Sequence, residues 1–262
     1  SGEPWEVLKK AVVKNLGLIN ASFVGKGAVG GIAGGAWGAV ITNCYVDGAV
    51  YSNLYTGGLV YTGGLVGNSG PLEISNSRNL AYVGGYYAGG FVGNYDGSEP
   101  LTIVNSYNAG TISSNGTYGA FVGFSVGKLI ISNSFNVGEK SLSREKLLVV
   151  GHHGRDTLIV DNYFYVDSWA SNKYGINIDE KELKDGTLAQ RLRNYNKDGI
   201  DGSVWGQWLG VDDIPQLSGK FVVGSSTLNI VAKTPSVVDG CYQIGTTEEL
   251  YGFGFIANAS LY

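Results

Sequence analysis

The stretches Ile103-Val104-Asn105-Ser106-Tyr107 and Ile131-Ser132-Asn133-Ser134-Phe135 repeat one phrase, in which an aliphatic residue precedes an asparagine by two positions. A glycine or alanine follows most of these asparagines by five positions. Copies centre on Asn20, Asn43, Asn76, Asn105, Asn133 and Asn162, and the last four are 29, 28 and 29 residues apart. A fixed period of this length is typical of repeat architectures, in which each unit packs on its neighbours.

A second phrase, glycine-rich and apolar, comes before most of the repeat asparagines. Its clearest copies are Gly63-Gly64-Leu65-Val66-Gly67, Gly89-Gly90-Phe91-Val92-Gly93 and Gly119-Ala120-Phe121-Val122-Gly123. Each unit therefore holds two short strand-like runs separated by turn residues, with no room for a helix of about ten residues. The fold class that we predict is all-β, a parallel β-helix (β-solenoid) with a small mixed C-terminal cap region.

In such a solenoid, equivalent residues of successive coils lie above one another, about 4.8 Å apart. The aliphatic residues two places before each asparagine are expected to form a column in the core. Asparagine tolerates left-handed backbone, and its amide both donates and accepts hydrogen bonds. We therefore expect a structural ladder at a turn, made of Asn43, Asn76, Asn105, Asn133 and Asn162. A leucine-rich-repeat horseshoe also stacks asparagines, but it requires a helix in every unit.

Composition excludes several other classes. The chain has 262 residues with 42 glycines, but its 44% hydrophobic content argues against disorder and its five prolines against collagen. The net charge is −4 and no basic run occurs, which disfavours nucleic-acid binding. No run of 18 apolar residues is present, so we expect no direct insertion into a membrane.

The repeat pattern divides the chain into three parts. We predict a solenoid over residues 1–168, a capping segment over 169–219, and C-terminal strands with a short helix over 220–262, where a further repeat unit begins. An exposed last coil needs a cover, and the middle part supplies a helix signal and large apolar groups for that role. The helix signal is a capping box of Thr187 and Gln190, and the apolar groups include Trp205 and Trp208.

The first coil poses the same problem, and Trp5, Leu8 and Val12 are candidates to cover it. Two insertions interrupt the repeats. Residues 55–60 duplicate residues 61–66 and are expected to add a strand, whereas residues 141–148 look like a solvated loop. Cys44 and Cys241 are either two unpaired residues or a disulfide that closes a long loop.

The two phrases together resemble the GLUG repeat, which is named for glycine, leucine, any residue and glycine. The resemblance covers about residues 13–168 and rests on Gly64-Leu65-Val66-Gly67, Gly90-Phe91-Val92-Gly93 and the asparagine phrases that follow them. It implies a large secreted or surface-attached bacterial protein, either adhesin-like or associated with immunoglobulin-A peptidases. It also implies that the repeats themselves carry no catalytic residues. We expect no cofactor and no metal.

The residues offer little catalytic chemistry of their own. The only histidines, His152 and His153, are adjacent, so a strand points them to opposite faces and they make a poor metal site, although Asp156 and Asp161 lie nearby in the sequence. Asp47, Glu73, Asp96 and Glu99 occupy different positions in the repeat and are not expected to stack into a catalytic pair. We expect no enzyme in this chain.

A binding surface is more plausible than a catalytic site. A speculative ligand surface is formed by Tyr82, Tyr86, Tyr87 and Tyr95, with Tyr55 and Tyr61 on the preceding unit. Such rings can stack on sugars or dock a protein, or they can merely cover a glycine-rich sheet.

The function that we infer is a non-catalytic secreted or cell-surface repeat module, acting as an adhesin-like stalk or interaction surface. Its partners would be an extracellular glycan or protein, with the signal and anchor outside this sequence. The alternative is a carbohydrate-binding or carbohydrate-processing β-helix.

Overall fold

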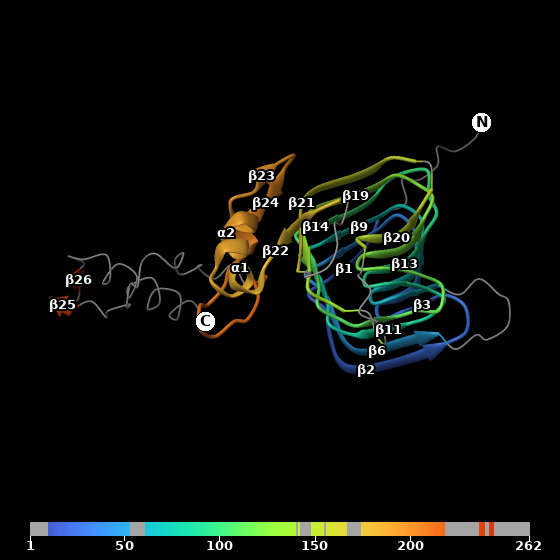
Figure 1. Cartoon of the computed structure of the whole chain (residues 1–262), viewed down its shortest axis with the longest axis horizontal. Coiled ribbons are helices and arrows are strands. Elements are labelled where there is room, and N and C mark those ends of the chain that lie inside the picture. The colour runs from blue at the N-terminus through green and yellow to red at the C-terminus, as the bar shows by residue number, and fades with distance from the viewer. Residues whose placement is uncertain are drawn as a thin grey trace, which may run out of the picture.

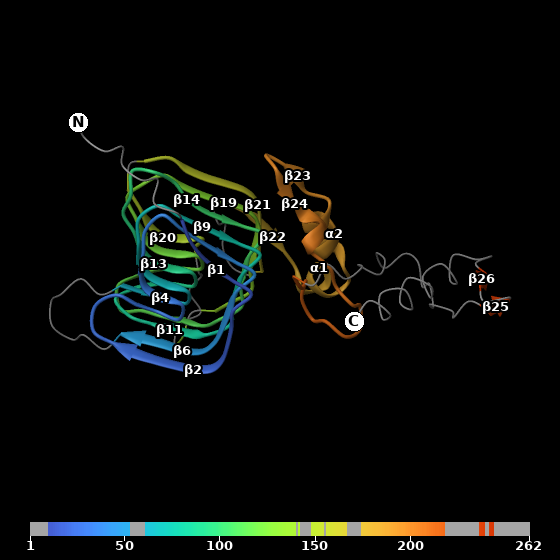
Figure 2. The same cartoon turned by 180° about the vertical axis from the view of Figure 1, so that it is seen from behind.

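The structure, a computed structural model, describes residues 10–52, 61–139, 141, 148–154, 156–166, 174–217, 236–238 and 241–243. The chain forms a parallel β-solenoid of about five turns, which confirms the predicted fold class. Figures 1 and 2 show the coils stacked in chain order from blue to olive, with a small helical segment in orange beside them.

The chain begins with β1 (Ala11–Lys14) and β2 (Gly17–Gly25). Coil one contains β3 (Val29–Gly30), β4 (Ala33–Ala36), β5 (Ala39–Thr42) and β6 (Tyr45–Ser52). Coil two contains β7 (Tyr61–Gly63), β8 (Val66–Ser69), β9 (Leu72–Ser75), β10 (Arg78–Asn79) and β11 (Tyr82–Gly84). Coil three contains β12 (Tyr87–Gly89), β13 (Val92–Tyr95), β14 (Leu101–Val104), β15 (Tyr107–Asn108) and β16 (Ile112–Ser113). Coil four contains β17 (Thr117–Gly119), β18 (Val122–Ser125) and β19 (Leu129–Asn136), and coil five β20 (Val150–His153) and β21 (Leu158–Val166).

Equivalent strands of successive coils pair in parallel and form three sheets along the solenoid. The largest has 13 strands and makes two walls, the upper one around β9, β14 and β19 and the lower one around β2, β6 and β11 in Figure 1. A sheet of β3, β7, β12 and β17 and a sheet of β4, β8, β13, β18 and β20 complete each coil. The glycine-rich phrase is the turn that joins these two smaller sheets.

The core contains the aliphatic column that the repeat predicts. Ile41, Ile74, Ile103 and Ile131 stack in register and are each at most 1% exposed. Burying a side chain of this kind stabilises the fold by about 1.5–3 kcal/mol. Val160, at the same position in coil five, is only half-buried.

The repeat asparagines lie at the turn between the upper and lower walls and adopt left-handed backbone. Their φ angles lie between 48° and 52° from Asn43 to Asn162. Asn162 Nδ2 donates to Asn133 Oδ1 at 2.7 Å, and Asn133 Nδ2 donates to Asn105 Oδ1 at 2.7 Å. The turn ladder is interrupted at Asn76, whose buried Oδ1 has no hydrogen-bond partner in the part of the chain that the structure describes.

The first member of the turn ladder is Asn15, and not Asn20, at which the sequence places the first copy of the repeat phrase. Asn43 Nδ2 donates to Asn15 Oδ1 at 2.8 Å, and Val13, rather than Leu18, pairs with Ile41. Asn20 lies in β2 where the pairing with β6 shifts register between Leu18 and Ala21. The local phrase around Asn20 fits the pattern, but only Asn15 keeps the 28-residue spacing to Asn43.

A second asparagine ladder, which the sequence analysis missed, runs inside the solenoid three residues after the first. Asn79 Nδ2 donates to Asn108 Oδ1, and Asn108 Nδ2 donates to Asn136 Oδ1, both at 2.8 Å. All three side chains of this inner ladder are buried. The glycine-rich turn reaches it from the other side, because a Cβ on Gly90 would lie 2.7 Å from Asn108 Oδ1 and 2.1 Å from the Ala120 carbonyl oxygen. Glycine is therefore required where the turn meets the ladder.

We predict that Asn108→Ala lowers the free energy of unfolding by about 1–3 kcal/mol, because it removes a buried partner from both Asn79 and Asn136. Urea denaturation followed by circular dichroism measures the change. Asn43→Gly is the matched control: Asn43 is exposed, and glycine tolerates its left-handed backbone, so its loss is expected to stay below about 1 kcal/mol. Equal losses of unfolding free energy in the two variants would show that the buried inner ladder stabilises the fold no more than one exposed asparagine does.

The C-terminal segment lies against the side of the solenoid as well as its last coil. It contains β22 (Ile176–Ile178), α1 (Glu180–Lys184), α2 (Thr187–Arg193), β23 (Asn196–Lys197), β24 (Ile200–Asp201) and η1 (Gly202–Val204). β22 pairs with β21, but Trp205 packs on Tyr107 of coil three and Phe135 of coil four, with ring centroids 6.1 and 5.4 Å apart. Asn105 and Asn133 also donate to backbone oxygens of this segment at 3.0 Å. The segment thus covers the turn ladder of coils three to five, a wider role than the end cap that we expected.

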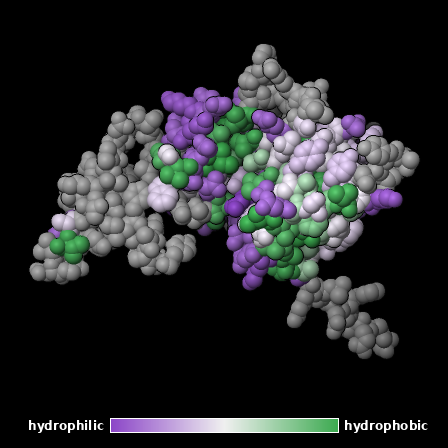
Figure 3. All heavy atoms as spheres, turned by 90° about the horizontal axis from the view of Figure 1, so that it is seen from below, coloured by the Kyte–Doolittle hydropathy of each residue, from purple (hydrophilic) through white to green (hydrophobic). Residues whose placement is uncertain are grey.

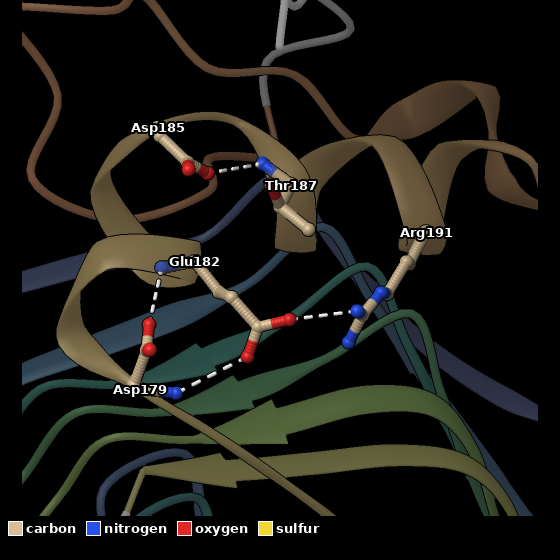
Figure 4. A network of polar contacts seen from close by, with 5 residues as sticks. All are labelled: Asp179, Glu182, Asp185, Thr187 and Arg191. Atoms are coloured by element: carbon tan, nitrogen blue, oxygen red, sulfur yellow. Dashed lines mark hydrogen bonds and ion pairs between the residues drawn. The ribbon is translucent and has the colours of Figure 1, made fainter. Parts of the chain in front are cut away.

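The predicted capping box at Thr187 does not form, and another forms one helix earlier (Figure 4). Asp179 and Glu182 bond reciprocally at the start of α1, with Glu182 N to Asp179 Oδ1 at 2.7 Å. Arg191 of α2 donates to Glu182 at 2.6 Å, and the backbone N–H of Thr187 donates to Asp185 at 3.0 Å. The carboxylates of the first helix therefore connect it to the second. Leu188 and Leu192 of α2 are buried as their spacing predicts.

Asp161 of coil five fastens this segment to the solenoid. Its carboxylate accepts hydrogen bonds from Lys197 at 2.6 Å and from Tyr195 at 2.9 Å. The Lys197 ammonium is the main reason why the pKa of Asp161 lies below its ordinary value of 3.8. Burial, followed by the bond to Asp161, raises the pKa of Tyr195 to about 12.

The lowered pKa of Asp161 gives a pH-dependent prediction. A carboxyl group with a depressed native pKa stabilises the fold above its unfolded pKa, and this contribution is lost as the pH falls through the native value. We expect Asp161→Asn to be less stable than the wild type at neutral pH, and the difference to shrink below about pH 4. Urea denaturation at stepped pH measures it, and a difference that persists unchanged in acid would contradict the assignment.

Several expectations fall outside the described residues. These are the roles of Trp5 and Leu8, the added strand over 55–60, most of the loop over 141–148 and the helix near Thr246. The boundaries of the three parts stay a prediction. Val12 lies within β1 and is exposed, so it does not cover the first coil.

The last described strands lie near the end of the chain, where β25 (Ser236–Val238) and β26 (Cys241–Gln243) form an antiparallel pair. Cys44 is a free, buried cysteine. None of the helices in the described ranges is both long and apolar enough to span a bilayer.

Candidate interaction surface

Aromatic side chains from four successive coils meet where the two smaller sheets adjoin. Tyr61 of β7 lies 5.5 Å from Tyr87 of β12, and Tyr87 lies 5.3 Å from Phe124 of β18, measured between ring centroids. Phe124 stacks on His152 of β20 with 4.9 Å between the rings and 9° between their planes. Tyr86 meets Tyr87 edge to face at 4.9 Å. We refer to these five residues as the aromatic row.

The aromatic row is partly open to solvent. Tyr86 is 51% exposed and His152 is also exposed, whereas Tyr61, Tyr87 and Phe124 are half-buried. Partial burial is the main cause that raises the pKa of Tyr61, with smaller contributions from Tyr87 and Asp96. Edge-to-face and offset rings support one another by about 0.5–1.5 kcal/mol per pair, so the row is a preformed surface rather than a set of independent side chains.

The structure separates the four tyrosines that we expected to form one ligand surface. Tyr86 and Tyr87 lie together in the aromatic row. Tyr82 lies in β11 of the lower wall, where a Cβ on Gly84 would touch both its ring and that of Tyr51. Tyr95 is fully buried, and its hydroxyl donates to backbone oxygens of Gly97 and Glu99, so it cannot contact a ligand.

Phe124 and His152 were missed because their role depends on register. Each follows the last glycine of its glycine-rich phrase, as Asn68 and Asn94 do in coils two and three. Aligning the repeats on that glycine, rather than on the asparagine, would have revealed the position. Asn94 Nδ2 donates to Asn68 Oδ1 at 2.8 Å, so this position is polar in coils two and three and aromatic in coils four and five.

The histidines point in different directions, as their adjacency implies. His152 belongs to the aromatic row, whereas His153 lies 3.2 Å from Ser125 Oγ and 2.9 Å from the carbonyl oxygen of Asp156. A serine next to a histidine can act as a nucleophile. Ser125 is fully buried, however, so a carbonyl substrate cannot approach its Oγ. Among the described residues, no group of three or more histidine, cysteine, aspartate or glutamate residues could hold a metal ion.

Two carboxylates that we expected to stay apart line the same hollow on the upper wall. The hollow has a volume of about 480 Å³ and is bordered by Gly38, Pro71, Glu73, Glu99 and Pro100. Lys10 also lines it and forms an ion pair with Glu73. Glu73 and Glu99 lie at different repeat positions, as the sequence indicated, but the turns between the sheets bring both to one site.

The lower wall carries exposed apolar side chains near the start of the solenoid. Figure 3 views the molecule from the side of β2, β6 and β11 and shows green apolar atoms gathered over the solenoid, with purple hydrophilic atoms mainly around them. Ile19 and Val24 of β2 are 65% and 64% exposed, and β2 pairs only with β6 among the described strands. β2 is therefore an apolar edge strand.

Comparisons with known proteins agree with this architecture. A crystal structure of a protein from Bacteroides ovatus, named as a candidate immunoglobulin A1 protease, superposes with a TM-score of 0.58 and is 19% identical in sequence. The match covers 79% of this chain and 69% of that chain. At this identity, the likeness shows a shared fold. No curated protein matches the chain in sequence.

The glycine-rich turn also identifies the repeat itself. Residues 25–51, which include all of coil one from β3 nearly to the end of β6, match the GLUG motif. Coils two to four repeat the same glycine turn and asparagine phrase in register with it. The chain is a GLUG-repeat protein, folded as a parallel β-solenoid.

Proposed function

We propose that this chain is a non-catalytic module of a secreted or cell-surface protein, and that it acts as a rigid spacer and adhesin-like interaction surface. The observation that carries the proposal is the aromatic row, a preformed and partly exposed surface built from four successive coils. Partly exposed tyrosine, phenylalanine and histidine rings held by regular backbone present a large contact area with little loss of side-chain entropy on binding.

The repeat architecture supports the spacer role. Main-chain hydrogen bonds and a continuous core join each coil to the next, and the asparagine ladders reinforce coils two to five, so the solenoid transmits force along its length. The helical segment adds lateral support across coils three to five. A secreted or surface location is supported by the GLUG motif and by the similar fold of the Bacteroides ovatus protein.

The non-catalytic role is supported by the burial and the ion pairing of the candidate catalytic groups. Ser125, next to His153, is inaccessible, and Glu73 is engaged by Lys10. A single row on one module would bind weakly, so useful affinity would come from several copies that act together.

The test measures binding of the whole chain, as a monomer and as a streptavidin-linked tetramer, to immobilised extracellular glycoproteins and to a glycan array. We expect binding that is weak for the monomer and at least about a hundredfold stronger for the tetramer. The double substitution Tyr86→Ala and Tyr87→Ala is expected to reduce this binding about tenfold or more, because the exposed Tyr86 ring and the half-buried Tyr87 ring are both lost.

Tyr82→Ala is the matched control, since Tyr82 is an exposed tyrosine four residues before Tyr86 that lies outside the aromatic row. It should leave binding unchanged. Absence of binding to every immobilised surface by the tetramer would contradict the adhesin-like role, and equal losses in both variants would contradict the assignment to the aromatic row.

A further inference from the structure

Trp37, on the turn between β4 and β5, is held flat across two coils. A Cβ on Gly35 would lie 2.5 Å from the six-membered edge of its indole, and a Cβ on Gly70 of coil two would lie 2.3 Å from the five-membered edge. Because any Cβ at these two positions would clash with the indole, glycine is required at both for the ring to pack flat against the backbone. The side chain is nevertheless 61% exposed, so the ring is fixed on one side and open to solvent on the other.

This arrangement restricts the rotation of an exposed aromatic side chain. An exposed tryptophan that merely fills space would be free to rotate, whereas Trp37 rests on a glycine bed supplied by neighbouring coils. The turn beneath it is fixed by main-chain bonds from Gly38 N to Pro71 O at 2.7 Å and from Gly70 N to Ala36 O at 3.1 Å. The ring is therefore preorganised, which lowers the entropy cost of binding to it.

Two residues with hydrogen-bonding side chains lie in register with the glycines beneath the ring. Asn68 pairs with Gly35, and Asp96 occupies in coil three the position that Gly70 occupies in coil two, because Tyr95 pairs with Ser69. Paired Cα atoms of neighbouring coils lie about 4.8 Å apart. The Cα of Asn68 is therefore about this far from that of Gly35, and the Cα of Asp96 about this far from that of Gly70. Asn68 Oδ1 accepts from Asn94, which turns the Asn68 Nδ2 donor to other partners. Asp96 is exposed.

The hollow on the upper wall begins at the same turn. Gly38 and Pro71, which follow Trp37 and Gly70, line it together with Glu73 and Glu99. Its volume of about 480 Å³ falls in the range of small-molecule sites. A flat apolar platform next to carboxylates and an amide matches the chemistry of a sugar, whose C–H face packs on an aromatic ring while its hydroxyls donate to carboxylates.

We propose that Trp37 is the stacking platform of a saccharide subsite, with Asn68 and Asp96 as its hydrogen-bonding rim and the hollow lined by Glu73 and Glu99 as the space for a neighbouring sugar unit. Among the described residues around this site, the carboxylates of Asp96, Glu73 and Glu99 outnumber the ammonium of Lys10. The ligand is therefore a neutral glycan, and sialylated or sulfated glycans are repelled. This proposal rests on the proposed function, because it names one ligand class for the same module. The residues that would bind this ligand lie outside the aromatic row.

The test applies the whole chain, as the streptavidin-linked tetramer, to an array that holds neutral, sialylated and sulfated glycans. Saturation-transfer NMR with methyl glycosides of glucose, galactose, mannose and N-acetylglucosamine then reports binding of single neutral sugars. We expect neutral glycans alone to bind, and Trp37→Ala to weaken that binding about tenfold or more. Asp96→Ala is expected to weaken it by about threefold or more through loss of a charged acceptor.

Trp208→Ala is the control for loss of an exposed tryptophan, because Trp208 is 40% exposed and lies in the C-terminal segment. Circular dichroism checks that each variant is folded. Binding of anionic glycans only, of no glycan at all, or equally to the wild type and to Trp37→Ala would overturn the saccharide subsite. Binding to proteins that depends on Tyr86 and Tyr87, without any glycan binding, would overturn this proposal and leave the proposed function intact.

Discussion

The parallel, in-register stacking of successive coils is the constraint on which the rest of the structure depends. In the upper wall of coils two to five, each residue lies over its equivalent 28 or 29 positions later, so one favourable contact can be repeated from coil to coil. The aliphatic column, both asparagine ladders and the aromatic row all follow from that geometry. The same constraint explains why single positions matter: a side chain that does not fit in one coil also displaces the coils above and below.

The glycine-rich turn and the inner asparagine ladder form one unit across the core. Gly90 approaches Asn108 from one side while Asn79 and Asn136 bond to it from below and above. Burying an amide without partners would be costly, but in this ladder each amide donates to the next, so a polar line can occupy the interior. The glycines that define the repeat are thus needed to fit backbone against this polar line and against the neighbouring coil.

Much of the architecture could be predicted from the sequence because the period is expressed in apolar residues and in left-handed asparagines. What could not be predicted depends on contacts between segments that are far apart. The local phrase at Asn20 concealed a bulge, and only the pairing with Asn43 identifies Asn15 as the ladder residue. The capping box at Asp179 and the lateral position of Trp205 depend on how the helical segment meets the solenoid. Among the candidate site residues, Tyr86 and Tyr87 lie together, whereas burial of Tyr95 and stacking of Phe124 on His152 depend on which face each strand turns outward.

The most direct measurement of the stacking register is disulfide formation between outward positions of the upper wall, in a background where Cys44 and Cys241 are serine. Thr102 pairs with Ile130, and Ile130 pairs with Ile159. Cα atoms of paired residues lie about 4.8 Å apart, within disulfide reach, whereas those two coils away lie roughly 9.6 Å apart and cannot be bridged. The structure predicts that Thr102→Cys with Ile130→Cys crosslinks readily and that Thr102→Cys with Ile159→Cys does not. Failure of the first pair, or crosslinking of the second in its place, would contradict the in-register stack.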